Sequence, residues 1–167
     1  MSASDDLSIR EAQPADWPRI WPFWRRIVAS GDTYMWEPST DEAAARAAWM
    51  QQPPTVVFVA EQAGTVVATA FLRPTQPGLG DHVANAAFMV DPDHAGGGIG
   101  RRLAEHVMAQ ARELGYTAMQ FNAVVETNAG AVELWRSLGF RVLATVPNAF
   151  RHATLGHVGV HVMHREL

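Results

Sequence analysis

A glycine-rich turn between a strand and a helix constrains the fold of this chain more than any other stretch. Residues 89–103 read MVDPDHAGGGIGRRL, with glycine at four of the five positions from 96 to 100. Pro92 ends the preceding strand, because proline has no N–H to donate to a sheet ladder. From Ile99 onward, apolar residues recur at three- and four-residue spacing, which predicts an amphipathic helix. We therefore expect a strand, an exposed glycine loop and a helix in direct succession.

The start of that helix is suited to binding an anion. Its first amides have no intrahelical acceptor, the helix dipole is positive there, and glycines leave the loop amides accessible. Arg101 and Arg102 follow directly, which favours a phosphate or pyrophosphate. A P-loop is excluded, since it needs a lysine after the last glycine and the chain contains no lysine. The dinucleotide fingerprint is excluded as well, because its third glycine would fall on Arg101 or Leu103.

The remaining interpretation of the loop rests on a family resemblance. The sequence VDP at 90–92 followed by GIG at 98–100 resembles the strand end and acyl-CoA loop of the GCN5-related N-acetyltransferases (GNAT). That loop has the pattern arginine or glutamine, then x-x-G-x-G/A, and its leading residue falls on Ala95, which is a departure. Residues 128–140, NAGAVELWRSLGF, resemble the family segment N-x-x-A-x-x-L-Y-x-x-x-G-F.

The resemblance implies an α/β fold of the GNAT type. This is a mixed six- to seven-stranded sheet with helices on both faces and splayed fourth and fifth strands. Hydrophobic patterns along the chain agree with that order of elements. We expect helices at 14–30, 41–50, 99–115 and 128–138. Strands are expected at 7–10, 56–60, 65–72, 83–90, 119–125, 140–146 and 158–166.

Composition limits the other possibilities. With 167 residues, 48% of them hydrophobic, the chain is expected to form one domain spanning 1–167. A net charge of −4 argues against nucleic acid as a partner, and the absence of cysteine excludes thiolate metal sites and a cysteine nucleophile. No metal site is expected. The acidic stretch 1–6 lacks the apolar core of a signal peptide and no run reaches membrane-spanning length, so we expect a cytoplasmic protein without a membrane partner.

The resemblance implies acetyl-CoA as the co-substrate. Its pyrophosphate would lie on the glycine loop, and its acetyl group beside the end of the fourth strand, where backbone donors stabilise a developing oxyanion. The asparagine that opens the second motif contacts the pantetheine or phosphate region in the family, and a helix N-cap is its other interpretation. The implied cofactor-binding residues are Phe88, Met89, Val90, Gly96, Gly97, Gly98, Ile99, Gly100, Arg101 and Asn128.

The implied reaction is direct transfer of an acetyl group to the amine of a small molecule, an amino acid or an amino-acid analogue. Trp135 stands where the family often has a tyrosine, whose hydroxyl is thought to protonate the departing thiolate. Indole donates an N–H but is not a practical acid at neutral pH, so water would supply that proton. The alternatives are a protein N-terminal acetyltransferase and a non-catalytic module that binds or senses acyl-CoA.

Two asparagines are expected to flank the point of transfer. Asn85 lies on the fourth strand and Asn122 in an otherwise apolar fifth strand. With residues 121–128 they resemble the fungal acetyltransferases of proline analogues, in which matching asparagines surround the substrate. The alternative is that each amide satisfies backbone groups at a strand irregularity. The candidate catalytic residues are therefore Asn85, Asn122 and Trp135.

The acceptor site also has candidate residues outside the sheet. Tyr34 and Trp36, in an aromatic loop, are expected to roof the site with Asn85 and Asn122, and packing in the core is the other interpretation of both rings. Glu126 is a candidate base or a solvated turn carboxylate, and His152 a candidate residue at the rim. The expected partner is a small-molecule amine, and a homodimer is an open alternative to a monomer.

Overall fold

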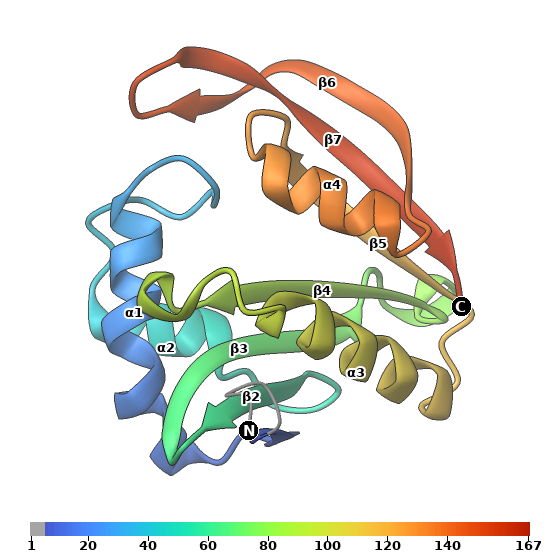
Figure 1. Ribbon diagram of the computed structural model, residues 1–167. Coiled ribbons are helices and arrows are strands. Elements are labelled where there is room, and N and C mark those ends of the chain that lie inside the picture. The colour runs from blue at the N-terminus through green and yellow to red at the C-terminus, as the bar shows by residue number, and fades with distance from the viewer. Residues whose placement is uncertain (1–5) are drawn as a thin grey trace.

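One seven-stranded sheet organises the protein (Figure 1). The computed structural model describes residues 6–167, so the first five residues, and with them most of the acidic N-terminal stretch, lie outside the described part. The strands are β1 (Leu7–Glu11), β2 (Val56–Gln62), β3 (Thr65–Pro74), β4 (Val83–Val90), β5 (Ala118–Val125), β6 (Arg141–His152) and β7 (Gly156–Glu166). The helices are α1 (Trp17–Ala29), α2 (Glu42–Trp49), α3 (Ile99–Glu113) and α4 (Ala129–Ser137).

The strand order is β1-β2-β3-β4-β5-β7-β6. β4 and β5 run parallel, joined through α3, and the other neighbouring strands run antiparallel. A parallel pair requires a crossover connection, which α3 supplies. The predicted α/β class and mixed sheet are confirmed.

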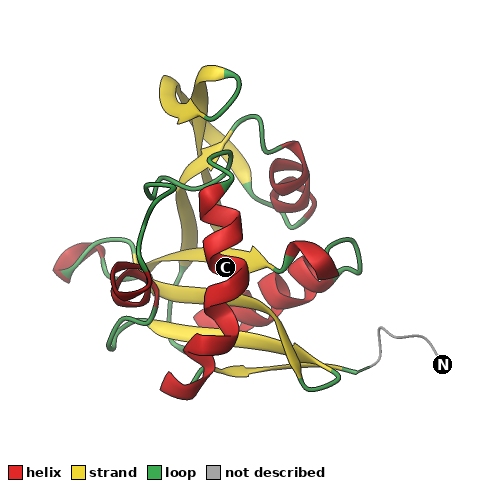
Figure 2. Ribbon diagram, turned by 90° about the vertical axis from the view of Figure 1, so that its left-hand side faces the viewer, coloured by secondary structure: helices red, strands yellow, loops and turns green. Residues whose placement is uncertain are grey.

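Helices cover both faces of the sheet, as predicted. On one face, α3 and α4 pack through Leu103, Val107 and Trp135 against β1–β5 and β7. On the other face, α1 and α2 pack through aromatic residues such as Trp24 and Trp49 against β2, β3 and β4. The second pair of helices therefore leaves the β5–β7–β6 part of its face without a helical cover (Figure 2).

The two central strands separate soon after they start. β4 and β5 pair only at Val83 with Ala118 and at Ala84 with Met119. Farther along, β5 is irregular between Phe121 and Val124 and turns away with β7. Figure 1 shows β4 and the β5–β7 pair diverging from the region of the C-terminus. The predicted splay of the fourth and fifth strands is confirmed.

The first helix starts later than its pattern predicted. Residues 14–16 form a 3-10 turn, and α1 begins at Trp17. The buried carboxylate of Asp16 accepts two bonds from Arg10, both at 2.8 Å, and one from the backbone N–H of Gln13 at 2.7 Å. These bonds connect β1 to the entry of α1. They hold the pKa of Asp16 at about 2, because Arg10 stabilises the ionised form.

β6 is longer than the sequence predicted. It was expected to end at 146 and instead continues to His152, with a register irregularity between Val146 and Phe150. Pro147 interrupts the apolar pattern, but an edge strand tolerates proline because one side of its backbone needs no partner. Asn148 adopts a positive φ of 55° within the irregularity. The β6–β7 hairpin consequently extends well beyond the rest of the sheet (Figures 1 and 2).

None of the helices in residues 6–167 is both long enough and apolar enough to cross a bilayer.

Candidate active site

The gap between β4 and β5 exposes backbone hydrogen-bonding groups. In the antiparallel ladder with β3, Asp91 donates to the carbonyl of Val67 at 2.8 Å, so the odd-numbered residues of β4 direct their backbone toward β3. Phe88 and Val90 then direct their N–H and C=O groups into the gap, beyond the last β4–β5 pair. Met89 differs, since its backbone faces β3 and its side chain is buried.

The glycine loop leads directly from this gap. Gly96 and Gly98 have φ values of 90° and 74°, a left-handed conformation that favours glycine. Gly98 is the N-cap of α3, and no side chain caps the amides of the first turn. A Cβ at 96, 97 or 98 would meet nothing within 4 Å, so the loop is open to a ligand. A Cβ at Gly100 would lie 3.6 Å from Val90 and 3.8 Å from Leu134, which lets α3 pack closely on β4 and α4.

Arg101 extends from the first turn of α3 toward α4. Its guanidinium donates to Glu105 at 3.2 Å and to the hydroxyl of Ser137 at 2.6 Å, on the exposed surface. The neighbouring Arg102 reaches the carbonyl of Leu7 on the β1 side. Glu105 therefore partly compensates the positive charge of Arg101, and the bonds to Glu105 and Ser137 fix the orientation of its guanidinium.

An aromatic group fills the gap from the α3–α4 face. Trp135 of α4 is 8% exposed, and its ring lies 5.0 Å from Phe88 of β4 and 4.6 Å from Phe121 of β5. Phe140 stacks on Phe121 at 4.5 Å. Trp135 thus bridges the two separating strands. Its only polar group is an indole N–H, which donates a hydrogen bond and does not ionise at neutral pH.

Amide side chains line the other face of the same gap. Asn85 Nδ2 donates to the carbonyl oxygen of Gln120 across the gap at 3.0 Å. Gln120 Nε2 in turn donates to Asn122 Oδ1 at 2.7 Å. The amide of Asn85 thus satisfies a backbone carbonyl, as one of the two interpretations held. Sequence reasoning overlooked Gln120, although its two-residue spacing from Asn122 placed both on one face.

Asn122 differs from the buried residues of its strand. The side chain is exposed, because the irregularity between Phe121 and Val124 leaves Asn122 and Ala123 outside the ladder with β7. The apolar neighbours in sequence suggested burial, but the strand turns its face toward an uncovered part of the sheet. Asn122 consequently remains accessible to a ligand.

The aromatic loop contacts the gap through one hydroxyl. Tyr34 donates to the carbonyl oxygen of Phe88, one of the groups that face the gap. Burial strongly raises the pKa of this phenol, so Tyr34 stays protonated at neutral pH. Its ring stacks on Trp36 at 5.4 Å, and Trp36 lies 5.3 Å from Trp24 and 6.0 Å from Trp49. Trp36 therefore packs against the core, while Tyr34 connects that core to β4.

Other candidate side chains have structural partners. Asn128 is the N-cap of α4, and its Oδ1 accepts from the amide of Ala131 at 3.4 Å. The carboxylate of Glu126 accepts from the amide of Gly159 at 2.6 Å, so it binds the backbone of β7 rather than solvent alone. His152 Nδ1 accepts from the amides of Thr154 and Leu155 and closes the β6–β7 turn. Within residues 6–167, no three acidic, histidine or cysteine side chains gather as metal ligands would.

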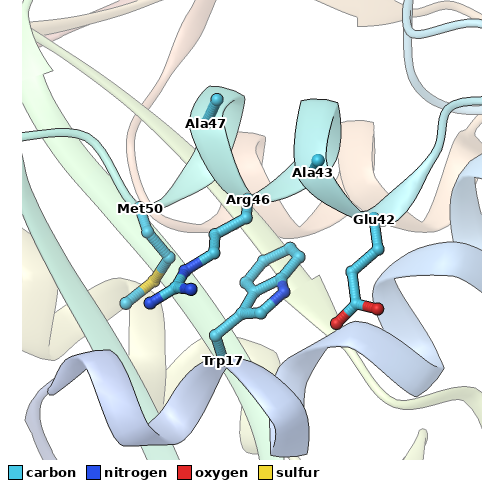
Figure 3. Close-up of a pocket in the computed structure, with 6 residues that line it drawn as sticks. All are labelled: Trp17, Glu42, Ala43, Arg46, Ala47 and Met50. Carbon is cyan, nitrogen blue, oxygen red and sulfur yellow. The ribbon is translucent and has the colours of Figure 1, made fainter.

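A separate hollow lies away from the gap. A shallow groove of about 620 Å³ runs between α1 and α2, and none of its six lining residues belongs to β4 or β5. Figure 3 shows the indole of Trp17 rising from α1 between the side chains of Arg46 and Glu42. The buried N–H of Trp17 has no hydrogen-bond partner among the described residues. The groove has no contact with the glycine loop, so we do not assign it to the active site.

The open glycine loop and the gap between the parallel strands are the two features that the family resemblance implied. The sequence model of the Acetyltransferase (GNAT) family matches residues 17–140. The chain therefore belongs to the GNAT family, whose acyl donor is acetyl-CoA, and the predicted family is confirmed.

Two curated relatives are similar to this chain. N-acetyltransferase aca1 of Schizosaccharomyces pombe is 35% identical over 89 residues, which cover 53% of this chain and 42% of that protein. The chain thus matches less than half the length of aca1. L-amino acid N-acyltransferase MnaT of Escherichia coli is 30% identical over 145 residues, 84% of this chain and 83% of that protein.

Solved structures agree with the observed fold. A GCN5-related N-acetyltransferase from Kribbella flavida is 50% identical, with a TM-score of 0.93 and coverage of 98% of this chain and 99% of that chain. The structure of yncA from Salmonella typhimurium with its cofactor acetyl-CoA is 26% identical, with a TM-score of 0.85 and coverage of 98% and 95%.

Proposed function

We propose that this protein transfers an acetyl group from acetyl-CoA to the amine of a small molecule, an amino acid or an amino-acid analogue. The observation that carries the proposal is the β4–β5 gap, where the N–H groups of Phe88 and Val90 lie outside the β4–β5 ladder, between the glycine loop and the amide cluster of Asn85, Gln120 and Asn122. The gap connects a cofactor face to an acceptor face. The similarity to MnaT supports an amino acid as the acceptor.

The open glycine loop fits the pyrophosphate of CoA. A side chain at 96, 97 or 98 would enter a space that is free of protein atoms, and the amides of Ile99 and Gly100 begin an uncapped helix. Arg101 adds a cation beside them, and Asn128 can donate through its amide nitrogen, since its Oδ1 already accepts from α4. Met89 directs its backbone groups toward β3. We therefore propose that it holds its neighbours Phe88 and Val90 in position rather than bonding to the cofactor itself.

Acetyl-CoA, when bound, supplies an activated acetyl thioester. The N–H groups of Phe88 and Val90 are placed to donate to the negative charge that develops on the acyl oxygen. Attack needs a neutral amine, whereas free amines are mostly protonated at pH 7. The amides of Asn85 and Asn122 cannot accept that proton themselves, but their oxygens can orient the amine or a water molecule that does. Trp135 packs the gap and leaves protonation of the thiolate to water.

A thiol-release assay over amino acids, amines without a carboxyl group and short peptides tests the proposal. We expect release with free amino acids, and stabilisation of the protein by CoA in a thermal shift. Release with peptide amino termini alone would identify a protein N-terminal acetyltransferase instead. Stabilisation by CoA without release on any acceptor would identify an acyl-CoA-binding or sensing module.

We also propose a homodimer. Leu143 and Val146 lie on the edge strand β6 and are 56% and 49% exposed. Exposed apolar side chains on an unpaired edge strand favour association with a second copy of the chain. Light scattering coupled to gel filtration measures the mass directly, and a monomer would contradict this part of the proposal.

A further inference from the structure

A row of polar residues crosses the sheet on the acceptor face. Arg73 near the end of β3 lies directly opposite Asn85 of β4, and Asn85 bonds to Gln120 of β5. Gln120 lies opposite His164 of β7, which lies opposite Arg141 of β6. Residues that lie directly opposite on paired strands share one face of a sheet. The row therefore contains two arginines and no acidic residue, and it extends from the α2 side to the uncovered part of the face.

Arg73 is held in place without an acidic partner. Its guanidinium lies 4.6 Å from the centre of the Phe71 ring, a cation–π contact, and donates to Gln51 Oε1 at 3.1 Å. Arg73 takes part in none of the ion pairs formed within residues 6–167. Stacking and a single bond to a neutral amide orient the guanidinium, while its other N–H donors stay available.

The ring under the Arg73 guanidinium lies closer to the transfer point along the sheet than Arg73 itself does. Phe71 lies two residues before Arg73 on β3 and opposite Ala87, the neighbour of Phe88 on β4. A continuous wall of aromatic rings connects the two places, with centre distances of 4.9 Å, 6.0 Å and 5.4 Å between successive rings from Phe71 through Trp49 and Trp36 to Tyr34. Tyr34 ends this wall on the carbonyl of Phe88. Arg73 and the proposed transfer point thus lie at opposite ends of this wall.

We propose that Arg73 binds the carboxylate of the acceptor, so that the substrate class is α-amino acids rather than amines in general; this rests on the proposed acetyltransferase function. A guanidinium matches a carboxylate through two parallel N–H bonds, which fix its orientation. In an α-amino acid one carbon separates the carboxylate from the amine, so anchoring the first also places the second. An amine without a carboxylate gains nothing from this residue.

Matched pairs of acceptors test the proposal. We pair L-leucine with isopentylamine, L-methionine with 3-(methylthio)propylamine, L-phenylalanine with phenethylamine and L-proline with pyrrolidine, and measure kcat and KM for each. Arg73→Gln is expected to raise KM for the amino acids at least about tenfold, because it removes charge-assisted hydrogen bonds, and to leave the amines within about twofold. Arg73→Lys should recover part of the loss. Arg46→Gln, which removes an exposed cation of α2, is the control and should change neither.

Two readouts separate the possible outcomes. CoA-dependent thermal stabilisation equal to wild type shows that each variant is folded and binds its cofactor. Equal effects of Arg73→Gln on both members of a pair, or an unchanged KM for the amino acids, would overturn the assignment of Arg73. A wild-type protein that prefers the decarboxylated amines would overturn it as well. A wild-type protein inactive on every acceptor, despite stabilisation by CoA, would instead refute the proposed function on which the assignment rests.

Discussion

Two glycines with nearly the same backbone offer a sharp test of the cofactor loop. Gly98 caps α3 with φ 74°, and Gly64 turns between β2 and β3 with φ 77°. A Cβ at either position would meet nothing within 4 Å. Gly98→Glu and Gly64→Glu therefore impose the same backbone strain and the same change of charge, but only the first is placed in the proposed phosphate site.

The backbone strain is expected to be similar in both variants. A left-handed conformation costs an L-residue roughly 1–2 kcal/mol, which corresponds to a loss of about 2–8 °C in Tm for a chain of this size. A carboxylate at position 98 recovers up to about 1 kcal/mol of this by interacting with the start of α3. That interaction occupies the same amides that would bind phosphate, so the gain in stability and the loss of affinity have one cause.

The cost in affinity is expected to differ. A hydrogen bond to a charged group contributes about 1.5–3 kcal/mol, so the loss of two weakens CoA binding by about 100-fold or more in Gly98→Glu. Gly64→Glu should bind as wild type does. Titration calorimetry at one ionic strength measures both dissociation constants. An unchanged constant in Gly98→Glu, or an equal loss in Gly64→Glu, would refute the assignment of the loop.

Three further changes follow from particular contacts. Trp135→Tyr should keep the CoA dissociation constant within about threefold, because the same aromatic neighbours hold either ring, and steady-state kinetics then measure whether an added hydroxyl raises kcat. Tyr34→Phe removes the bond to Phe88 and should cost about 0.5–1.5 kcal/mol in chemical denaturation; no loss would contradict that contact. Asp16→Asn should cost about 1–2 kcal/mol at pH 7, after allowing for screening of the half-exposed Arg10. Because the folded pKa of Asp16 is about 2 against 3.8, wild type loses this stability as the pH falls through that interval, and urea midpoints should converge there.

The glycine loop and the order of elements were predictable from the sequence because their causes are local. Gly96 and Gly98 need a left-handed backbone, Asn128 caps the helix that follows it, and apolar spacing determines where α3 forms. Each of these depends on residues within about one turn of helix. The family resemblance extended these local motifs to a prediction of the complete fold.

The acceptor face was less predictable because it depends on strand register. Arg73 and Asn85 are twelve positions apart in sequence and become neighbours only when β3 pairs with β4. Asn122 is exposed because of an irregularity in β5 that its apolar neighbours concealed. The bond from Tyr34 to Phe88 spans 54 positions. Hydrophobic pattern assigns a residue to a face, but only the pairing of distant strands decides which residues meet there.

The separation of β4 and β5 makes the sheet incomplete in its own middle. Two residue pairs and the Asn85–Gln120 bond join the β1–β4 half to the β5–β7 half along these strands. The inner edges of β4 and β5 face each other, so they do not offer an outside chain a template for pairing, as an exposed edge would. A ligand with amides along its length can occupy the place of the missing strand and hydrogen-bond to Phe88 and Val90. The bound cofactor would then link the two halves of the sheet. Hydrogen exchange of the β4 amides should therefore slow when the cofactor is added, while exchange of the β2 amides is unchanged.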